Sequence, residues 1–189
     1  MAIRLAPAER RARILDTAMA ITDAEGHRGL TMAELARRCD MSTPGLLHYF
    51  PDMPTLLVAL VQRRDERDDA GLDWEAMTPD RVRLLLDATV ANIVARPRAA
   101  LLFAAVEAEA LDPTHPGHDY FRARADRLAS GLASMLSGPD AEGLARRLFA
   151  AMDGLQLHYL RDPEGFDLVA QWAATADALL GPEGAPVAP

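Results

Sequence analysis

Two helix-start signals lie close together near the N-terminus, and they constrain the fold more than any other feature of the sequence. Thr31 begins the segment TMAE, a capping box in which the threonine hydroxyl accepts from the Glu34 N–H and the Glu34 side chain reaches back. Ser42 is a favourable N-cap, and Pro44 follows it in the first helical turn, where a missing N–H has no cost. Asp40 lies between them, and aspartate tolerates left-handed backbone. The pattern predicts two helices joined by a three-residue turn.

The flanking sequence predicts one helix before this pair and a long one after it. Over residues 7–25, Ile14, Ala18 and Ile21 recur on one helical face. Over residues 53–69, a further helix is expected, with Pro51 and Pro54 marking its start. A supporting helix followed by helix, turn and helix is the arrangement in which the last helix enters the major groove of DNA.

The remainder of the chain is also predicted to be helical. Prolines mark the breaks between segments, and aromatic residues make up only 5% of the sequence, which favours packed helices over a β core. The expected helices span about 80–95, 97–111, 117–136, 140–160 and 165–180. The sequence therefore predicts an all-α fold of about nine helices. The residues after 181 are rich in proline and glycine, and we expect residues 182–189 to be disordered.

Composition and charge narrow the class of protein. The single cysteine, Cys39, excludes an internal disulfide framework, and we expect a cytoplasmic protein because neither a signal peptide nor an apolar run of about 18 residues is evident. The net charge of −8 is uneven along the chain. Residues 1–50 contain 7 arginines and 6 acidic residues, whereas residues 51–189 contain 13 arginines and 22 acidic residues. This asymmetry predicts two regions with different partners.

The N-terminal motifs occur together in RARILDTAMAITDAEGHRGLTMAELARRCDMSTPGLLHYFPDMPTLL. This stretch resembles the DNA-binding domain of TetR/AcrR-type bacterial transcriptional regulators. LFAAVEAEALDP and AMDGLQLHYLRDPEGFDL look like the ligand-binding and dimerisation domain of the same family, nearest its BetI-like branch. The resemblance implies a DNA-binding domain over residues 1–52 and a helical ligand-binding and dimerisation domain over residues 53–181.

The resemblance also implies which residues contact DNA. Small and polar groups on the exposed first turns of the third helix suit base edges and phosphates, while Leu46 and Phe50 are expected to pack inward. The predicted DNA-contact set is Arg10, Arg11, Arg13, Thr31, Met32, Ser42, Thr43, Pro44, Gly45, Leu47, His48, Tyr49 and Met53.

Three positions depart from the pattern that the resemblance implies. The family commonly has tyrosine where this chain has Leu47, and lysine where it has Met53, and both usual residues contact the DNA backbone. The usual turn glycine is replaced by Asp40, which adds a negative charge near the DNA. Each lost phosphate contact should reduce the salt dependence of binding by about one unit of slope. We expect the N-terminal arginines to compensate.

The C-terminal region carries the candidates for effector binding and dimerisation. A predicted pocket for a small-molecule effector is formed by Phe103, Glu107, Tyr120, Phe121, Met152, Gln156 and Tyr159. Glu107 either meets a cationic ligand or pairs with Arg122 or Arg124. The resemblance also implies that the last two long helices pair with their symmetry mates, and an apolar stripe suits this pairing. The expected dimer interface is formed by Leu148, Met152, Leu155, Tyr159, Trp172 and Leu179.

The sequence favours a ligand-responsive repressor that binds a palindromic operator in double-stranded DNA as a homodimer. A helical small-molecule-binding protein whose DNA binding has weakened or been lost is the alternative, motivated by Leu47 and Met53. An enzyme is not expected, because the sequence offers no nucleophile–base pairing and no phosphate-binding glycine loop. His115 and His118 could bind a metal, but loop polarity explains them better, so no metal and no cofactor is predicted.

Overall fold

The computed structural model describes residues 6–69, 81–136 and 138–181. These residues are helical throughout their regular elements and contain no strand, which confirms the all-α prediction. They fall into two compact units. Residues up to 69 and residues 98–119 form the first unit, and residues 81–97 and those from 120 onward form the second.

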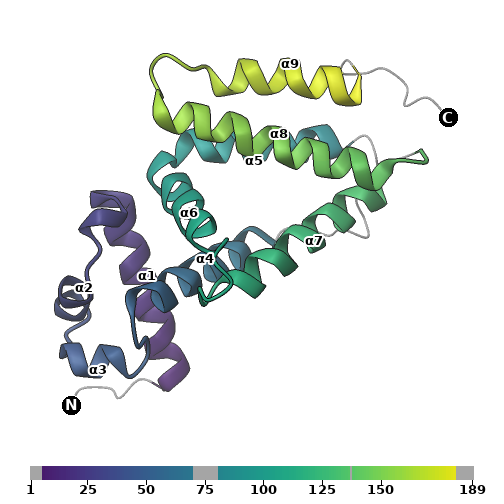
Figure 1. Ribbon diagram of the computed structural model, residues 1–189. Coiled ribbons are helices and arrows are strands. Elements are labelled where there is room, and N and C mark those ends of the chain that lie inside the picture. The colour runs from purple at the N-terminus through teal and green to yellow at the C-terminus, as the bar shows by residue number, and fades with distance from the viewer. Residues whose placement is uncertain (1–5, 70–80, 137, 182–189) are drawn as a thin grey trace. The chain divides into compact units, whose positions relative to one another are not determined.

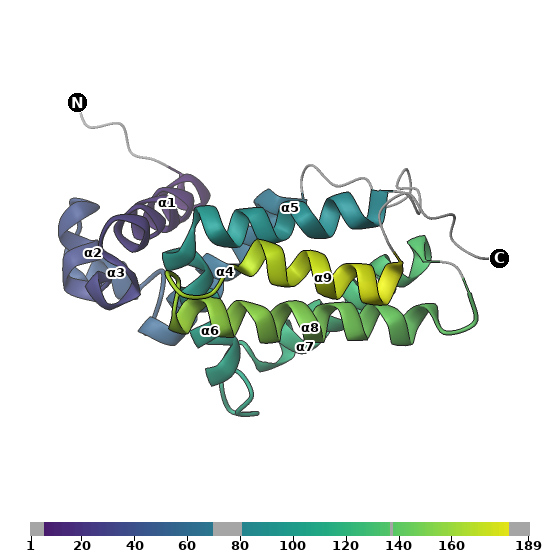
Figure 2. The same ribbon diagram turned by 90° about the horizontal axis from the view of Figure 1, so that it is seen from above.

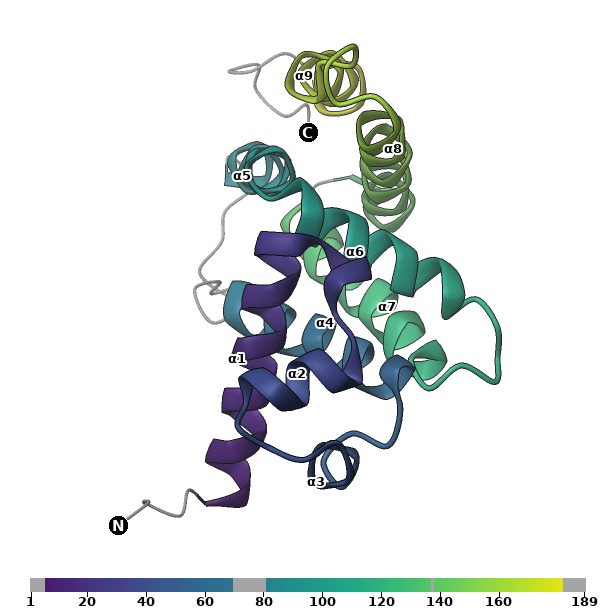
Figure 3. The ribbon, with the colours of Figure 1, turned by 90° about the vertical axis from the view of Figure 1, so that its left-hand side faces the viewer.

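The first unit contains the N-terminal helices (Figures 1 and 3). These are α1 (Pro7–Glu25), the short 3-10 helix η1 (His27–Gly29), α2 (Met32–Arg38), α3 (Thr43–Leu47) and α4 (Met53–Asp69). All of α6 (Pro97–Glu109) except Pro97 belongs to the same unit. α1 packs against α2 and α4, and α3 packs against α2. The core is formed by side chains that are almost completely buried, namely Ile14, Ile21, Leu35, Leu46, Phe50, Leu56 and Leu60.

The second unit contains α5 (Val82–Ala95), α7 (His118–Met135) from Tyr120 onward, α8 (Ala141–Arg161) and α9 (Leu168–Leu180). Figure 2 shows α9 lying alongside both α5 and α8, and contacts join α9 to each of them. Buried Trp172 of α9 donates its indole N–H to Asp87 of α5, at 2.7 Å. Arg83 joins the same helices by binding Asp87 at 2.9 Å and Asp177 at 2.6 Å.

The predicted helix boundaries hold closely in most of the chain, with local exceptions. η1 was not predicted, and α3 ends at Leu47, whereas the sequence predicts a helix that continues to Phe50. The next two residues form a tight turn, in which the N–H groups of Tyr49 and Phe50 both donate to the Leu46 carbonyl. α9 begins at Leu168, where Asp167 accepts the Ala170 N–H at 3.0 Å and so caps the helix.

Two sequence predictions, the domain boundary after residue 52 and the disordered tail, are not tested by the structure. The contacts group α4 and most of α6 with the N-terminal helices, so the boundary after residue 52 remains a prediction about function. The tail predicted over 182–189 lies outside the described residues. No single described helix is both long and apolar enough to cross a membrane, although α5 and α6 meet the length and composition criteria as a bent pair.

Candidate nucleic-acid interface

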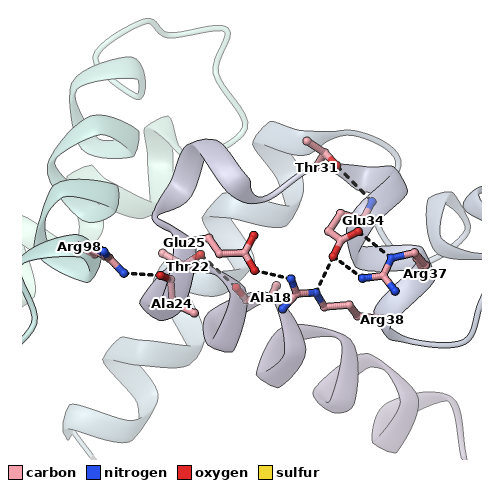
Figure 4. Close-up of polar contacts among 9 residues, drawn as sticks. All are labelled: Ala18, Thr22, Ala24, Glu25, Thr31, Glu34, Arg37, Arg38 and Arg98. Atoms are coloured by element: carbon pink, nitrogen blue, oxygen red, sulfur yellow. Dashed lines mark hydrogen bonds and ion pairs between the residues drawn. The ribbon is translucent and has the colours of Figure 1, made fainter.

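The start of α2 is fixed by a side-chain cap and by a cluster of ion pairs. The Thr31 hydroxyl accepts the Glu34 N–H at 3.1 Å, as the capping box predicts. The Glu34 carboxylate is bound by Arg37 at 2.7 Å and by Arg38 at 2.6 Å, in place of the predicted bond back to the Thr31 backbone. Hydrogen bonds from these two arginines lower the Glu34 pKa from 4.5 to about 2. Arg38 also binds Glu25, which ties α2 to the end of α1 (Figure 4).

The turn between α2 and α3 requires a left-handed residue, and Asp40 provides it with φ of 52°. The Met41 N–H donates to the Ala36 carbonyl at 2.9 Å, and the Asp40 N–H donates to the Arg37 carbonyl at 3.3 Å. This pair of bonds is a Schellman motif, in which glycine is the favoured left-handed residue. The prediction that Asp40 adopts this conformation is confirmed.

α3 is held by a cap at its start and by apolar anchors on its inner side. The Ser42 hydroxyl accepts the Gly45 N–H at 3.2 Å. A Cβ at Gly45 would lie 3.1 Å from the Ser42 Oγ, so any larger residue would press on the cap. Leu46 and Phe50 are both fully buried, which confirms that they pack inward. The backbone of α3 is therefore positioned by residues on one side, leaving its other side exposed.

Most of the predicted DNA-contact residues lie on α3 or directly beside it. Thr31, on the cap of α2, is exposed as well, and Met32 is half-buried. Ser42, Thr43, Pro44, Leu47 and His48 are exposed, whereas Gly45, Tyr49 and Met53 are half-buried. The rings of His48 and Tyr49 meet edge to face, with centroids 5.9 Å apart. The face combines hydroxyl, imidazole and apolar groups, and it carries no side chain with a permanent positive charge.

The three N-terminal arginines occupy different environments. The Arg11 guanidinium stacks over the Phe50 ring at 4.9 Å and lines a hollow of about 210 Å³ with residues of α1 and α4. Arg13 is exposed and Arg10 is half-buried. Neither of these two side chains has a hydrogen-bond or ion-pair partner among the residues that the structure describes, so both remain available for a phosphate.

A contact between α6 and the end of α1 supports this region, and the sequence did not predict it. Arg98, the second residue of α6, donates to the Asp23 carbonyl at 3.0 Å. It also donates to the Ala24 carbonyl, and Figure 4 shows this second bond. Both carbonyls belong to the last turn of α1, where a cation is favourable for the helix dipole. The sequence shows only an arginine that follows Pro97, and no local pattern in it identifies α1 as the partner of this arginine.

The predicted effector-pocket residues are divided between the two compact units. Phe103 and Glu107 belong to the first unit, where the Arg64 guanidinium lies over the Phe103 ring at 5.4 Å and Glu107 is half-buried. Tyr120, Phe121, Met152, Gln156 and Tyr159 belong to the second unit. Tyr159 lines an open hollow of about 380 Å³ together with Phe166 and neighbours at the start of α9. A pocket shared by all seven residues stays a prediction.

Most of the predicted dimer residues lie inside the single chain. Leu148, Met152, Tyr159 and Trp172 are buried, whereas Leu155 and Leu179 are half-buried. The dimer interface formed by these six residues stays a prediction. The large exposed apolar side chains of α8 and α9 among the described residues are Leu157 and Val169.

Two histidines near the start of α7, His115 in the preceding loop and His118 as its first residue, make local contacts. His115 accepts the Gly117 N–H through Nδ1 at 3.1 Å, and its Nε2 lies 4.0 Å from Glu109. His118 Nδ1 lies 2.9 Å from the Ala110 carbonyl. No group of three or more potential metal ligands occurs among the described residues.

Residues 14–60 match the family model described as "Bacterial regulatory proteins, tetR family". The HTH-type transcriptional repressor KstR of Mycolicibacterium smegmatis is 41% identical over 69 residues, which are 36% of this chain and 34% of that protein. The matched segment thus spans about a third of the length of KstR.

Similarity also extends over most of the chain at lower identity. The HTH-type transcriptional regulator BetI of Rhizobium meliloti is 27% identical over 175 residues, covering 89% of this chain and 86% of that protein. The Thermus thermophilus FadR structure, a tetR-family repressor in complex with lauroyl-CoA, has a TM-score of 0.62 at 19% identity. That match covers 95% of this chain and 97% of FadR, and at this identity it shows a shared fold.

Proposed function

Because the chain belongs to the tetR family of bacterial regulatory proteins, we propose that it represses transcription in the cytoplasm by binding a palindromic operator as a homodimer. The observation that carries this proposal is the exposed face of α3, held in place by the Ser42 cap outside and by Leu46 and Phe50 inside. A helix presented in this way can enter the major groove of duplex DNA. Two copies would read two half-sites about one helical turn, or a multiple of a turn, apart.

The contacts to DNA divide into those that position the protein and those that read bases. Arg10 and Arg13 on α1 are the cations that we assign to phosphates, while Thr43, Leu47 and His48 are the side chains that we assign to base edges. Arg11 is exposed as well, and its guanidinium covers the Phe50 ring. The salt dependence of binding should therefore be modest for a regulator of this kind, because few phosphates are neutralised per protomer.

The test is a mobility-shift assay on the DNA upstream of the gene for this chain and upstream of its neighbours. We expect retardation at low salt that is competed by the same duplex and not by scrambled DNA. The variants Arg10→Ala and Arg13→Ala should weaken binding on all sequences alike, since phosphates carry no sequence information. An absence of retardation at low salt on every upstream fragment would refute DNA binding as the function.

For the homodimer, we propose an interface on the outer faces of α8 and α9. Leu157 is 45% exposed and Val169 is 53% exposed, and both belong to the second unit, in which these helices pack together. The variants Leu157→Arg and Val169→Arg should convert the dimer to monomers in sedimentation velocity. Leu84→Arg is the matched control, because Leu84 is a 69% exposed leucine on α5. Dissociation by the control alone would place the interface elsewhere.

We further propose that a small molecule bound by the C-terminal helices releases the operator. Such a ligand acts by binding more tightly to the conformation whose recognition helices do not match the half-site spacing. The shared fold with FadR is consistent with this kind of regulation, but a fold does not define a ligand. The effector is sought by measuring which compounds raise the melting temperature and also weaken retardation.

A helical small-molecule-binding protein with weakened DNA binding is the second candidate. The uncharged Leu47 and Met53, where related proteins carry DNA-backbone contacts, favour it. The variant Met53→Lys separates the two candidates, because it leaves Leu47, which we assign to a base edge, unchanged. A strong gain from almost no binding supports the second candidate, whereas a small gain over tight binding supports the repressor.

A further inference from the structure

The exposed face of α3 is apolar at its centre. Leu47 is 39% exposed, and among described residues 6–69 it is the one large hydrophobic side chain that is exposed. Thr43 and Pro44 precede it by four and three residues, so the three side chains lie on the same side of the helix, and all three are exposed. Elsewhere in this stretch the large apolar residues are buried, which makes the exposed position of Leu47 a feature of α3 itself.

The exposure of Leu47 follows from how α3 is anchored. Leu46 and Phe50 fill the inner side and are fully buried, and Leu47 is one position on from Leu46, so it faces outward. The helix is only five residues long and is fixed at its start by the Ser42 hydroxyl. Leu47 therefore cannot turn inward without displacing Leu46 from the core.

The side chains that usually distinguish guanine or adenine are missing from this face. Arginine and lysine read guanine, and asparagine and glutamine read adenine, but none of the four occurs in the segment STPGLLHY from Ser42 to Tyr49. The apolar group that the major groove offers is the C5-methyl of thymine. The methyl group of Thr43, the ring of Pro44 and the isobutyl group of Leu47 match that group chemically.

We propose that α3 reads its half-site mainly through thymine methyl groups, with Leu47 as the residue that determines this specificity. Thr43 and Pro44 flank the same methyl-reading surface, and His48 supplies the polar contact. This inference rests on the proposed function, because it names the base feature that the DNA-binding face recognises. It predicts an operator with thymines at fixed positions in each half-site.

The expected effect follows from the area that one methyl group removes from water. Burying one methyl against an apolar side chain contributes a factor of about four in affinity, equivalent to about 0.8 kcal/mol. Two symmetric half-sites should then give a factor of about fifteen when the same methyl is removed from both.

The experiment uses the full-length protein and duplexes selected by it from a randomised DNA library. The selected duplex is resynthesised with deoxyuridine in place of thymine, one symmetric pair of positions at a time, because this removes only the methyl group. Dissociation constants are measured at one fixed salt concentration. We expect one or two thymine positions per half-site at which deoxyuridine weakens binding about fifteenfold, and no effect outside the half-sites.

Two leucine variants show whether Leu47 carries the effect. Leu47→Ala should bind the thymine and deoxyuridine duplexes equally, while Leu84→Ala, a change at an exposed leucine of α5, should keep the full discrimination. Leu47→Ala is expected to fold, since it changes an exposed helical position to a good helix former, and a melting curve checks this.

The outcomes separate this inference from the proposed function. Tight selection of a duplex that is insensitive to deoxyuridine would overturn methyl reading and leave the DNA-binding function in place. Discrimination that survives in Leu47→Ala would overturn the role of Leu47. Failure to select any duplex would refute the proposed function and this inference with it.

Discussion

Replacing Met53 by lysine should strengthen DNA binding while weakening the fold. Met53 is the first residue of α4 and is half-buried, and it directly follows Asp52, which accepts the Thr55 N–H at 2.8 Å. A lysine at this position can neutralise one phosphate per protomer, or two per dimer. The slope of log K against log salt should then steepen by about 1.8, from about 0.9 per phosphate. Between about 50 and 200 mM salt this amounts to an additional loss of about twelvefold.

The same lysine places a cation at the positive end of a helix dipole. This should cost about 0.3–1 kcal/mol of folding free energy, and it should lower the melting temperature by roughly 1–4 °C for a chain of this size. Met53→Gln is the control, because it adds a polar group of similar length without charge. The assays are fluorescence anisotropy across a salt series and thermal unfolding. An unchanged salt slope, or a gain shared equally by Met53→Gln, would refute the assignment of position 53 to a phosphate.

Three further predictions concern the stability of single contacts. Asp40→Ala should lower the melting temperature by about 2–4 °C, because alanine in the left-handed region costs about 1 kcal/mol. Asp40→Asn should leave the melting temperature unchanged. Equal melting temperatures of the two variants would contradict this prediction. Glu34→Gln should flatten the dependence of unfolding free energy on pH between about 4.5 and 2: the lowered pKa of Glu34 makes its arginine contacts stabilising above that window, and they are lost as pH falls through it. A chemical-denaturation series across this pH range measures the effect, which an unchanged profile would refute. Trp172→Phe removes the indole donor to Asp87 and should reduce the free energy of unfolding by about 1–3 kcal/mol in urea denaturation. A smaller loss than in Leu84→Ala, at an exposed position of α5, would argue against that bond.

Local signals in the sequence predicted the N-terminal helices well. Thr31 and Ser42 are caps in the structure, because each hydroxyl accepts the backbone N–H group three residues later. This hydrogen bond depends on local sequence and not on the rest of the chain. Asp40 is left-handed for a similarly local reason. The exception is Glu34, whose carboxylate binds Arg37 and Arg38, because charged donors compete for it more strongly than a backbone N–H does.

Long-range partners were not predictable in the same way. Periodicity identified an apolar stripe on α8 that includes Leu148 and Met152, but a stripe does not say whether its own chain or a partner covers it. The structure buries both residues within the single chain. The stacking of Arg11 on Phe50 has the same origin, because the two residues are 39 positions apart and no local pattern joins them.

The contact between Arg98 and the end of α1 affects how this protein can be recombined with its relatives. A chimera that transfers only the N-terminal helices would leave the Asp23 and Ala24 carbonyls without their donor, and it would also separate Phe103 from Arg64. The portable module is therefore discontinuous in sequence and includes α6 from Arg98 onward. Exchanging operator specificity between such regulators should succeed more often when residue 98 and its neighbours move together with α1.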